Sequence, residues 1–342
     1  MNRAVRILMV CLCLIIAAGA GTLVLFYNLN KPVDSIPEGG VVFTVETGDA
    51  LAAVAQRLEN DDLIRSHLFF QALGRIYRTD GKMKTGLYRI ESGFSTMEVH
   101  NLLVSGTQVL FKVTIPEGWT SGMIGSLLEE EGITTQEEFL QACETPALVE
   151  RVGAVSGSIE GFLYPDTYYF TGDYPAPGIV EYMVDTFFTS LEEIFPEWEE
   201  LSREDLYERV ILASIVEREY RDSSEAPLMA SVFYNRLEKD MFLGSCATVV
   251  YALTEEMGEE HPERLTYSDL EVESAYNTYR NRGLPPGPIS NPGNVALDAA
   301  FNPEQSDYLY FVLKDPEAGR HHFSRSLGEH NQAYTLYIKR GY

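Results

Sequence analysis

An uncharged apolar run near the N-terminus constrains this chain more than any other feature of its sequence. No residue from Ile7 to Tyr27 carries a charge. As a helix, a run of this length spans ~30 Å, the thickness of the hydrocarbon core of a bilayer. The sequence therefore predicts a transmembrane helix over residues 7–27.

The charges that flank the run predict its orientation. Arg3 and Arg6 precede it, and Lys31 is the only base that follows closely. The positive-inside rule places residues 1–6 in the cytoplasm and everything after the helix outside. A cleaved signal peptide is the alternative, because the small residues at 18–21 suit a peptidase. Since signal peptides have shorter apolar regions, we favour a retained anchor in the cell membrane.

The overall charge limits the kinds of partner. The chain has 342 residues, with 26 Lys and Arg against 51 Asp and Glu, which gives a formal net charge of −25. Nucleic-acid binding requires a basic face, so a nucleic-acid partner is not expected. The hydrophobic share of 45% is that of a globular protein, and the length predicts about two domains.

The cysteine count excludes a disulfide scaffold. Of the four cysteines, Cys11 and Cys13 lie inside the apolar run, and Cys143 and Cys246 lie outside it. Those two could pair, but nothing in the sequence shows that they do. Two free, buried thiols are therefore the default expectation.

The first half contains short strand–turn–helix units after a predicted tether over residues 28–40. β-rich runs at 41–48, 86–93 and 109–113 each lead, through glycine-containing turns, into apolar residues at helical spacing. Small modules of this kind include LysM-like glycan binders, so we predict a LysM-like α+β region over 41–140. A spacer or assembly domain is an equally good interpretation.

One helix carries the candidate chemistry. Ser202 is a suitable cap for a helix that extends to residue 219 and is apolar nearly all round. At 100° per residue, Glu217 continues the stripe formed by Leu206, Val210 and Ala213.

A carboxyl group in an apolar wall loses hydration, which raises its pKa and allows it to hold a proton near neutral pH. A general acid acting on a glycosidic oxygen needs this property. The alternative is a structural ion pair of Glu217 with Arg218, Arg221 or another base.

Further along the chain, the segment 283–293 has four prolines and three glycines in 11 residues. Such a composition predicts a rigid loop that lines a cleft, with a plain connection as the alternative.

Several motifs follow one another in an order that is typical of one family. They are EGFLYPDTY (160–168), ASIVERE (213–219), ASVFYNRL (230–237), AYNTY (275–279), GLPPGPISNPG (283–293), YLYFV (308–312), GRHHF (319–323) and EHN (329–331). With this ordered set the chain resembles the endolytic murein transglycosylases, also described as YceG-like.

The resemblance implies a fold and a reaction. The implied fold class is α+β: a single N-terminal transmembrane helix, a small LysM-like α+β domain, and a mainly helical α+β catalytic domain over 141–342. The implied reaction cleaves peptidoglycan glycan strands between N-acetylmuramic acid and N-acetylglucosamine without water, because the muramic C6 hydroxyl closes onto C1 and leaves a 1,6-anhydro end. The family's catalytic glutamate falls on Glu217, which would act first as acid and then as base.

Sugar binding is expected to use aromatic faces, amides and hydroxyls. The candidate substrate-binding residues are Tyr276, Asn277, Tyr279, Asn235, Ser245 and Thr248, with Tyr234 as a further aromatic candidate. Many relatives read Leu-Gln-Ser-Asp-Pro-Thr where this chain has Leu-Gly-Ser-Cys-Ala-Thr at 243–248. This departure puts the detail of sugar binding in doubt.

Two other functions stay open at this point. One is a non-catalytic, membrane-anchored peptidoglycan-binding or wall-assembly scaffold, and the other is a lysozyme-type hydrolase. Neither a cofactor nor a metal is expected, because the six histidines are scattered and no His-Glu-x-x-His pattern occurs. Association with peptidoglycan synthases and with elongation or division proteins is implied only by the resemblance.

Overall fold

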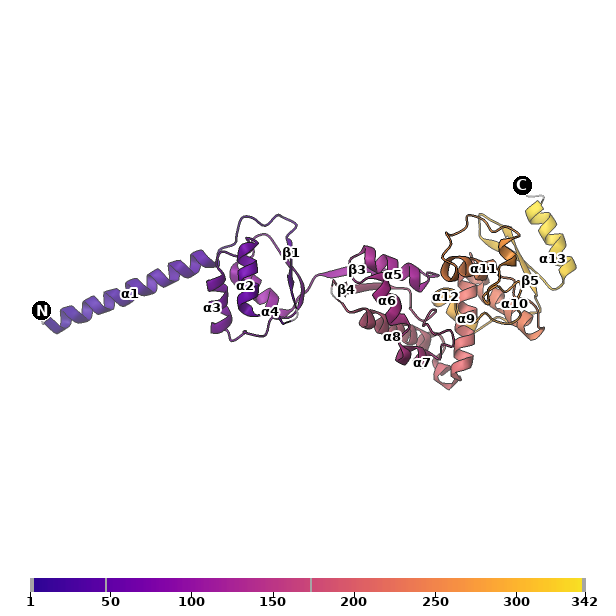
Figure 1. Cartoon of the computed structure of the whole chain (residues 1–342), viewed down its shortest axis with the longest axis horizontal. Helices are drawn as coiled ribbons and strands as arrows, with labels where there is room; N and C mark the ends of the chain where they lie inside the picture. The colour runs from indigo at the N-terminus through magenta and orange to yellow at the C-terminus, as the bar shows by residue number, and fades with distance from the viewer. Residues whose placement is uncertain (1–2, 47, 173, 340–342) are drawn as a thin grey trace. The chain divides into compact units, whose positions relative to one another are not determined.

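The computed structural model describes residues 3–46, 48–172 and 174–339, which form two compact units (Figure 1). The first unit contains residues 3–46, 48–111 and 171–172, and the second contains residues 112–170 and 174–339. Both mix helices with short two-stranded sheets, as the α+β prediction required.

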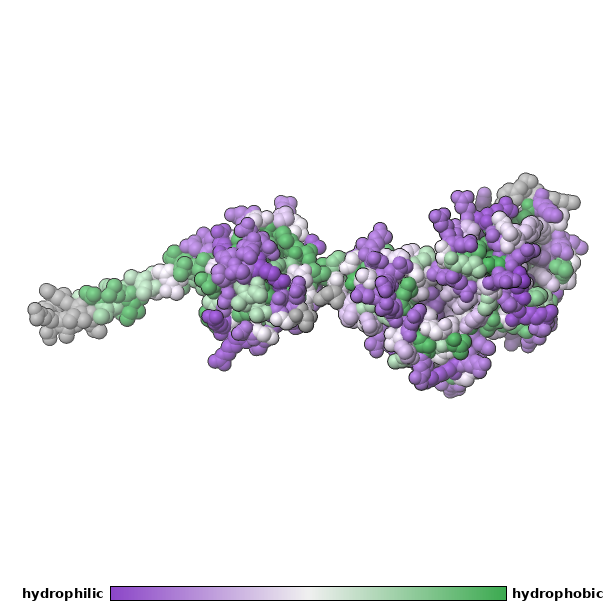
Figure 2. All heavy atoms as spheres, in the orientation of Figure 1, coloured by the Kyte–Doolittle hydropathy of each residue, from purple (hydrophilic) through white to green (hydrophobic). Residues whose placement is uncertain are grey.

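The first helix, α1 (Arg3–Asn30), contains the predicted apolar run. Residues Met9–Asn30 have a mean hydropathy of 2.6 and are long and apolar enough to cross a membrane. Figure 2 shows hydrophobic residues along this helix. The orientation of the helix in a membrane stays a prediction.

The segment after the apolar run is packed on the first unit, although the sequence predicted a tether over 28–40. Residues 28–30 continue α1, and Ile36 is 5% exposed in the hydrophobic core. Thr96 Oγ1 donates to the carbonyl of Leu29 at 3.0 Å, and Asn30 Oδ1 accepts from the amide of Met97 at 2.9 Å. These contacts attach the end of α1 to the unit.

The remainder of the first unit is one small sheet covered by three helices. Its elements are β1 (Val41–Val45), α2 (Leu51–Asn60), α3 (His67–Ile76), β2 (Gly86–Ile90) and α4 (Thr96–Ser105). The strands β1 and β2 pair antiparallel, from Val41 opposite Ile90 to Val45 opposite Gly86. The strands and helices predicted after residues 41 and 86 are thus confirmed, whereas the LysM-like assignment stays a prediction.

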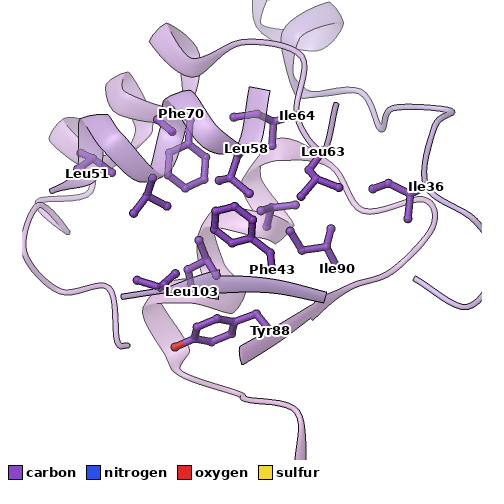
Figure 3. Close-up of a cluster of buried hydrophobic side chains, with 14 residues drawn as sticks. Ile36, Phe43, Leu51, Leu58, Leu63, Ile64, Phe70, Tyr88, Ile90 and Leu103 are labelled. Atoms are coloured by element: carbon purple, nitrogen blue, oxygen red, sulfur yellow. The ribbon is translucent and has the colours of Figure 1, made fainter. Parts of the chain in front are cut away.

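Alternation along β1 places one face of the sheet in the core. Phe43 and Val45 are buried, and Figure 3 shows the Phe43 ring pointing toward Leu58 and Phe70 from α2 and α3. Burial of apolar surface is the dominant favourable contribution to folding, so this cluster holds sheet and helices together. Capping fixes the ends of α4: Ser95 and Glu98 form a capping box, and Gly106 ends the helix at φ 78°.

The second unit is mainly helical. Its strands and longer helices are β3 (Leu110–Thr114), α5 (Ser121–Glu130), α6 (Gln136–Cys143), α7 (Pro146–Val152), β4 (Thr167–Thr171), α8 (Ala176–Ile194), α9 (Arg203–Glu219), α10 (Ala226–Glu238), α11 (Cys246–Tyr251), α12 (Asn294–Phe301), β5 (Tyr310–Asp315), β6 (Arg320–Ser324) and α13 (Leu327–Tyr334). Pairs β3–β4 and β5–β6 each form a two-stranded sheet.

The chain passes from the first unit to the second at residue 112 and not at residue 140, where the sequence analysis placed the domain boundary. The reason is that α6 packs against α8 and α5 packs against α6, which buries Phe139 completely. Residues 112–140 therefore belong to the same core as the later helices, and the assignment of catalysis to that part of the chain stays a prediction.

Helix α9 runs through the core of the second unit, as predicted from its composition. Every residue from Val210 to Val216 is buried, and the helix packs against α10, α11 and α12. Ser202 caps its N-terminus by accepting from the amide of Asp205 at 3.0 Å. The last turn of α9, which ends at Glu219, is therefore held in place by the buried part of the helix.

The separate cores yield a prediction for stability. Replacing the buried Leu58 (Leu58→Ala) removes core methyl groups and should destabilise the first unit by about 2–5 kcal/mol. The same change at the exposed Gln56 on the same helix should cost no more than about 0.5 kcal/mol. Denaturant unfolding followed by circular dichroism measures both units.

Tryptophan fluorescence separates the units in that experiment. Trp119 and Trp198 both belong to the second unit, and no other tryptophan exists in the chain. Leu58→Ala should shift the circular dichroism transition and leave the fluorescence transition in place. An equal shift of both signals would contradict separate cores.

Candidate active site

Glu217 lies in the last turn of α9, half-buried, with its carboxylate facing the end of the proline-rich loop. The backbone amide of Gly293 donates to Glu217 Oε2 at 3.0 Å. The hydroxyl of Tyr220, the residue at which α9 ends, lies 3.5 Å from Glu217 Oε1. A core helix and an ordered loop thus position this side chain jointly.

The surroundings of Glu217 favour its protonated form. Burial raises the pKa of its carboxyl group to about 7, and the neighbouring carboxylate of Glu117 acts in the same direction. The Gly293 amide, the Tyr220 hydroxyl and the Arg218 charge oppose this shift without cancelling it. At neutral pH this group can therefore both give and take a proton.

The alternative of a structural ion pair does not hold for Glu217. Within the described part of the chain, no Lys, Arg or His nitrogen lies within 4.0 Å of its carboxylate. Arg218, one of the partners named in the sequence analysis, donates instead to the carbonyl of Gly118 at 2.8 Å.

Close backbone approaches at two glycines shape the space beside Glu217. Gly118 has φ 75°, and a Cβ there would touch the Glu217 side chain at 3.4 Å. A Cβ on Gly293 would overlap the carboxylate of Glu117. The positive φ favours glycine at Gly118, and a side chain at Gly293 would displace that of Glu117. Glu117, which the sequence analysis did not single out, is a further member of the site.

The loop 283–293 is held by Asn291, which is completely buried. Its Oδ1 accepts from the amides of Gly161 and Leu163, both at 2.9 Å. Its Nδ2 donates to the carbonyl of Trp119 at 3.0 Å and to Glu160 at 2.6 Å. One amide side chain therefore connects the loop to two separate backbone segments, at 119 and at 161–163, and to the Glu160 carboxylate.

The backbone of Asn291 completes this connection. Its amide donates to the carbonyl of Trp119 at 2.8 Å, and its carbonyl accepts from the amide of Gly118 at 2.9 Å. Because Gly293 follows two residues later, Asn291 determines where the Gly293 amide meets Glu217. The sequence predicted a rigid loop here, but no local pattern marked Asn291.

Glu160 is a second buried carboxyl group with a raised pKa. It is 4% exposed and accepts from the backbone amide of Ser121 at the start of α5 and from the Ser121 hydroxyl at 2.6 Å. Burial raises its pKa to about 7 despite these donors. Glu160 is enclosed by protein and supports the loop through its bond to Asn291.

Four of the predicted substrate-binding residues make internal hydrogen bonds. Ser245, Thr248 and Asn277 are buried. Asn277 Nδ2 donates to the carbonyls of Leu270 and Val272. Thr248 bonds Thr278 and the Ser245 carbonyl, and the Ser245 hydroxyl donates to Glu219.

Asn235 is partly buried, and its Nδ2 donates to the carbonyls of Ser306 and Tyr308. In this structure these four residues thus stabilise loops through their internal hydrogen bonds, and their role in sugar binding stays a prediction. Tyr234 likewise donates its hydroxyl to the carbonyl of Ala300 at 2.7 Å.

The two predicted tyrosines remain partly accessible. The Tyr276 ring packs on Tyr251 with ring centroids 4.7 Å apart, and burial raises its pKa to about 12. The Tyr279 hydroxyl lies 3.1 Å from Cys246 Sγ. The role of both in substrate binding stays a prediction.

The cysteines do not pair. Cys143 is buried and Cys246 is exposed, and both are free. The expectation of free thiols is confirmed, but the expected burial of Cys246 is wrong, because it opens the short helix α11 at the surface.

A cavity of about 380 Å³ is lined by residues that include the sequence neighbour of Glu217. Arg218 contributes to its wall together with Thr120, Ala247, Tyr251, Glu255 and Ile289. Glu217 is not part of that wall. The altered segment 243–248 therefore reaches this cavity through Ala247.

The raised pKa of Glu217 predicts a pH-dependent stability effect. Between the ordinary value of 4.5 and about 7, the folded chain holds a proton that the unfolded chain releases, so stability falls as pH rises through this window. Glu217→Gln should therefore raise the melting temperature relative to the parent at about pH 8 and much less at about pH 4.

Glu208→Gln, on an exposed position of the same helix, is the matched control and should show no such pH dependence. Thermal unfolding at both pH values measures the difference. An effect of Glu217→Gln that is equal at both values would contradict the raised pKa.

Asn291→Ala tests the loop anchor. It leaves the buried amides of Gly161 and Leu163 without an acceptor, and each such group costs about 1–3 kcal/mol. The Trp119 carbonyl keeps the backbone amide of residue 291 as its donor, and Glu160 keeps its bonds from Ser121. We expect a loss of about 2 kcal/mol or more in the free energy of unfolding. Asn281→Ala, which removes hydrogen bonds of an exposed side chain to backbone carbonyls, should cost far less. Equal losses in denaturant titrations would refute the anchor.

Comparisons with known proteins agree with this architecture. The model of the YceG-like family matches residues 43–335. A protein of Bacillus subtilis named endolytic murein transglycosylase is 29% identical over 327 residues, covering 91% of this chain and 88% of the relative. A protein of the same name from Streptococcus pneumoniae is 26% identical over 336 residues, and the match spans 60% of that longer chain.

A solved structure is also similar. The crystal structure of a YceG-like protein from Listeria monocytogenes matches with a TM-score of 0.57 and 31% identity, covering 86% of this chain and 99% of the other. Since the family model and this structure both extend over most of its length, the chain belongs to the YceG-like family.

Proposed function

We propose that this chain is a lytic transglycosylase, a lyase that acts on peptidoglycan. The names of its curated relatives support this activity and substrate class. The observation that carries the proposal is Glu217: a carboxyl group without an ion pair in the described residues, held by a backbone amide at the end of a core helix, with a pKa of about 7.

In the proposed reaction Glu217 acts twice on a glycan strand. As an acid it protonates the oxygen that leaves C1 of N-acetylmuramic acid, and the glycosidic bond breaks. As a carboxylate it then removes the proton from the muramic C6 hydroxyl, whose oxygen bonds to C1. The products are a 1,6-anhydro end and a free N-acetylglucosamine hydroxyl, and Glu217 ends protonated as it began.

The surroundings of Glu217 suit both steps. The Gly293 amide stabilises the carboxylate that exists between them. The exposed carboxylate of Glu117 places negative charge near the reacting carbon, where positive charge develops in the transition state. The reaction would take place outside the cytoplasm, with α1 as the membrane anchor and peptidoglycan synthases as possible neighbours.

Glu117 also favours a second candidate function. Lysozyme-type hydrolases use two carboxyl groups at the cleaved bond, and Glu117 lies close enough to Glu217 to raise its pKa. Hydrolysis would add water to the product instead of forming the anhydro ring. A scaffold without activity is the third outcome.

Product analysis distinguishes the three. The full-length protein in detergent is incubated with purified glycan strands, and the products are identified by mass spectrometry. The parent should release anhydro ends, and Glu217→Gln should lower the rate by about 10²–10⁴-fold because the proton donor is lost. Glu208→Gln should retain the parent rate.

The other outcomes overturn the proposal. Products that carry an added water, together with a comparable loss of rate in Glu117→Gln, would identify a hydrolase. Absence of any product from the correctly folded parent would identify a scaffold.

A further inference from the structure

The C-terminal end of α1 contacts α3, a surface helix with large apolar side chains exposed to solvent. On α3, Leu68 is 68% exposed and Ile76 is 72% exposed, and Tyr77 directly after the helix is 53% exposed. Helical spacing places Leu68, Phe69, Ala72 and Ile76 within about 100° of one another. We name these four residues the α3 face.

The α3 face is continuous with the apolar surface of α1. The rings of Phe26, in α1, and Phe69 contact each other with centroids 5.2 Å apart. Figure 1 shows α3 on the side of the first unit from which α1 emerges. Because Phe26 belongs to the stretch that is apolar enough to span a membrane, the α3 face lies at the level where that stretch ends.

Bases outnumber acids in the sequence along α3 and just after it, in a chain that is otherwise strongly acidic. Residues 65–84 contain five bases, which are Arg65, Arg75, Arg78, Lys82 and Lys84, and one acid, Asp80. The whole chain has a net charge of −25. Since charges are screened beyond about 8–10 Å, the local positive segment decides which surface can approach it.

Side chains typical of a membrane interface occupy the junction itself. Lys31 Nζ lies over the Tyr27 ring, 4.7 Å from its centroid. The Arg65 guanidinium donates to the carbonyls of Lys31 and Pro32, at 3.2 Å and 2.7 Å. Tyrosine, lysine and arginine at the end of an apolar helix are characteristic interface anchors.

We propose that the α3 face inserts into the headgroup region of an anionic lipid bilayer, alongside the point where α1 leaves it. An apolar face flanked by bases is the pattern of helices that lie in a membrane interface, where buried apolar area and attraction to anionic lipids both contribute. The inference requires that α1 is embedded in the membrane, and it is independent of the proposed catalysis. The first unit is then held against the bilayer at two places and has a defined orientation on it.

A fluorescent probe tests the insertion. In full-length protein with Cys11, Cys13, Cys143 and Cys246 replaced by Ala, Leu68→Cys is labelled with an environment-sensitive dye and reconstituted in vesicles of phosphatidylcholine with about a third phosphatidylglycerol. Val155→Cys, at a position 82% exposed in the second unit, is the matched control.

Lipids that carry a quencher near the headgroup should lower the emission at position 68 by about twofold or more and leave position 155 unchanged. Arg75→Glu with Arg78→Glu should weaken the quenching in these vesicles and have less effect in pure phosphatidylcholine. Equal behaviour of positions 68 and 155 would overturn the proposal. This is also the result expected if the face binds another protein, since the vesicles contain none.

A second measurement needs no substitution. Hydroxyl-radical footprinting of the native chain in the same lipids compares Leu68 and Ile76 with Val155 and with Tyr267, which is 91% exposed. Oxidation of Leu68 and Ile76 should be several-fold lower than their exposure predicts. Oxidation in proportion to exposure at all four positions would refute insertion, whatever the fate of the labelled variants.

Discussion

The buried side chain of Asn291 is the interaction on which the candidate site depends. An amide with two donors and two accepted bonds can satisfy backbone groups from several segments, and here it meets residues 119, 160, 161 and 163 at once. These segments are far apart in sequence and have no shared helix or sheet. Without such a partner their buried polar groups would each carry a desolvation cost, so the loop and its surroundings are stable only together.

This arrangement lets the carboxyl group of Glu217 gain or lose a proton near neutral pH. Glu217 sits at the end of a helix that is buried along most of its length, so its position is defined from one side. The loop fixed by Asn291 supplies the Gly293 amide from the other side. Burial and Glu117 raise the pKa, whereas the amide keeps the charged form attainable, and this balance suits a group that must act as both acid and base.

The sequence analysis located the helix and the glutamate, and it named as sugar-binding candidates several residues that the structure shows bonded within the protein. Polar residues in an aromatic loop, such as Asn277 and Thr248, indicated sugar contacts, yet they are buried and bonded within the protein. Composition cannot separate a side chain that holds a loop by internal hydrogen bonds from one that binds a sugar hydroxyl, because both use the same donors and acceptors. The tether was misjudged for a related reason: proline and glycine suggested flexibility, but Ile36 packs into a core formed by residues much later in the chain.

The sequence alone determined the periodic features: the apolar N-terminal helix, the short strands of the first half, the buried character of 210–216 and the stripe that leads to Glu217. Each depends on neighbours within a few turns or strand residues, and local spacing therefore reports it. Only the tertiary structure decided that Glu217 has no ion pair among the described residues, that Asn291 connects three segments, that Glu117 stands nearby and that α3 adjoins the end of α1. These facts depend on contacts between residues tens of positions or more apart, for which a single sequence carries no distance information.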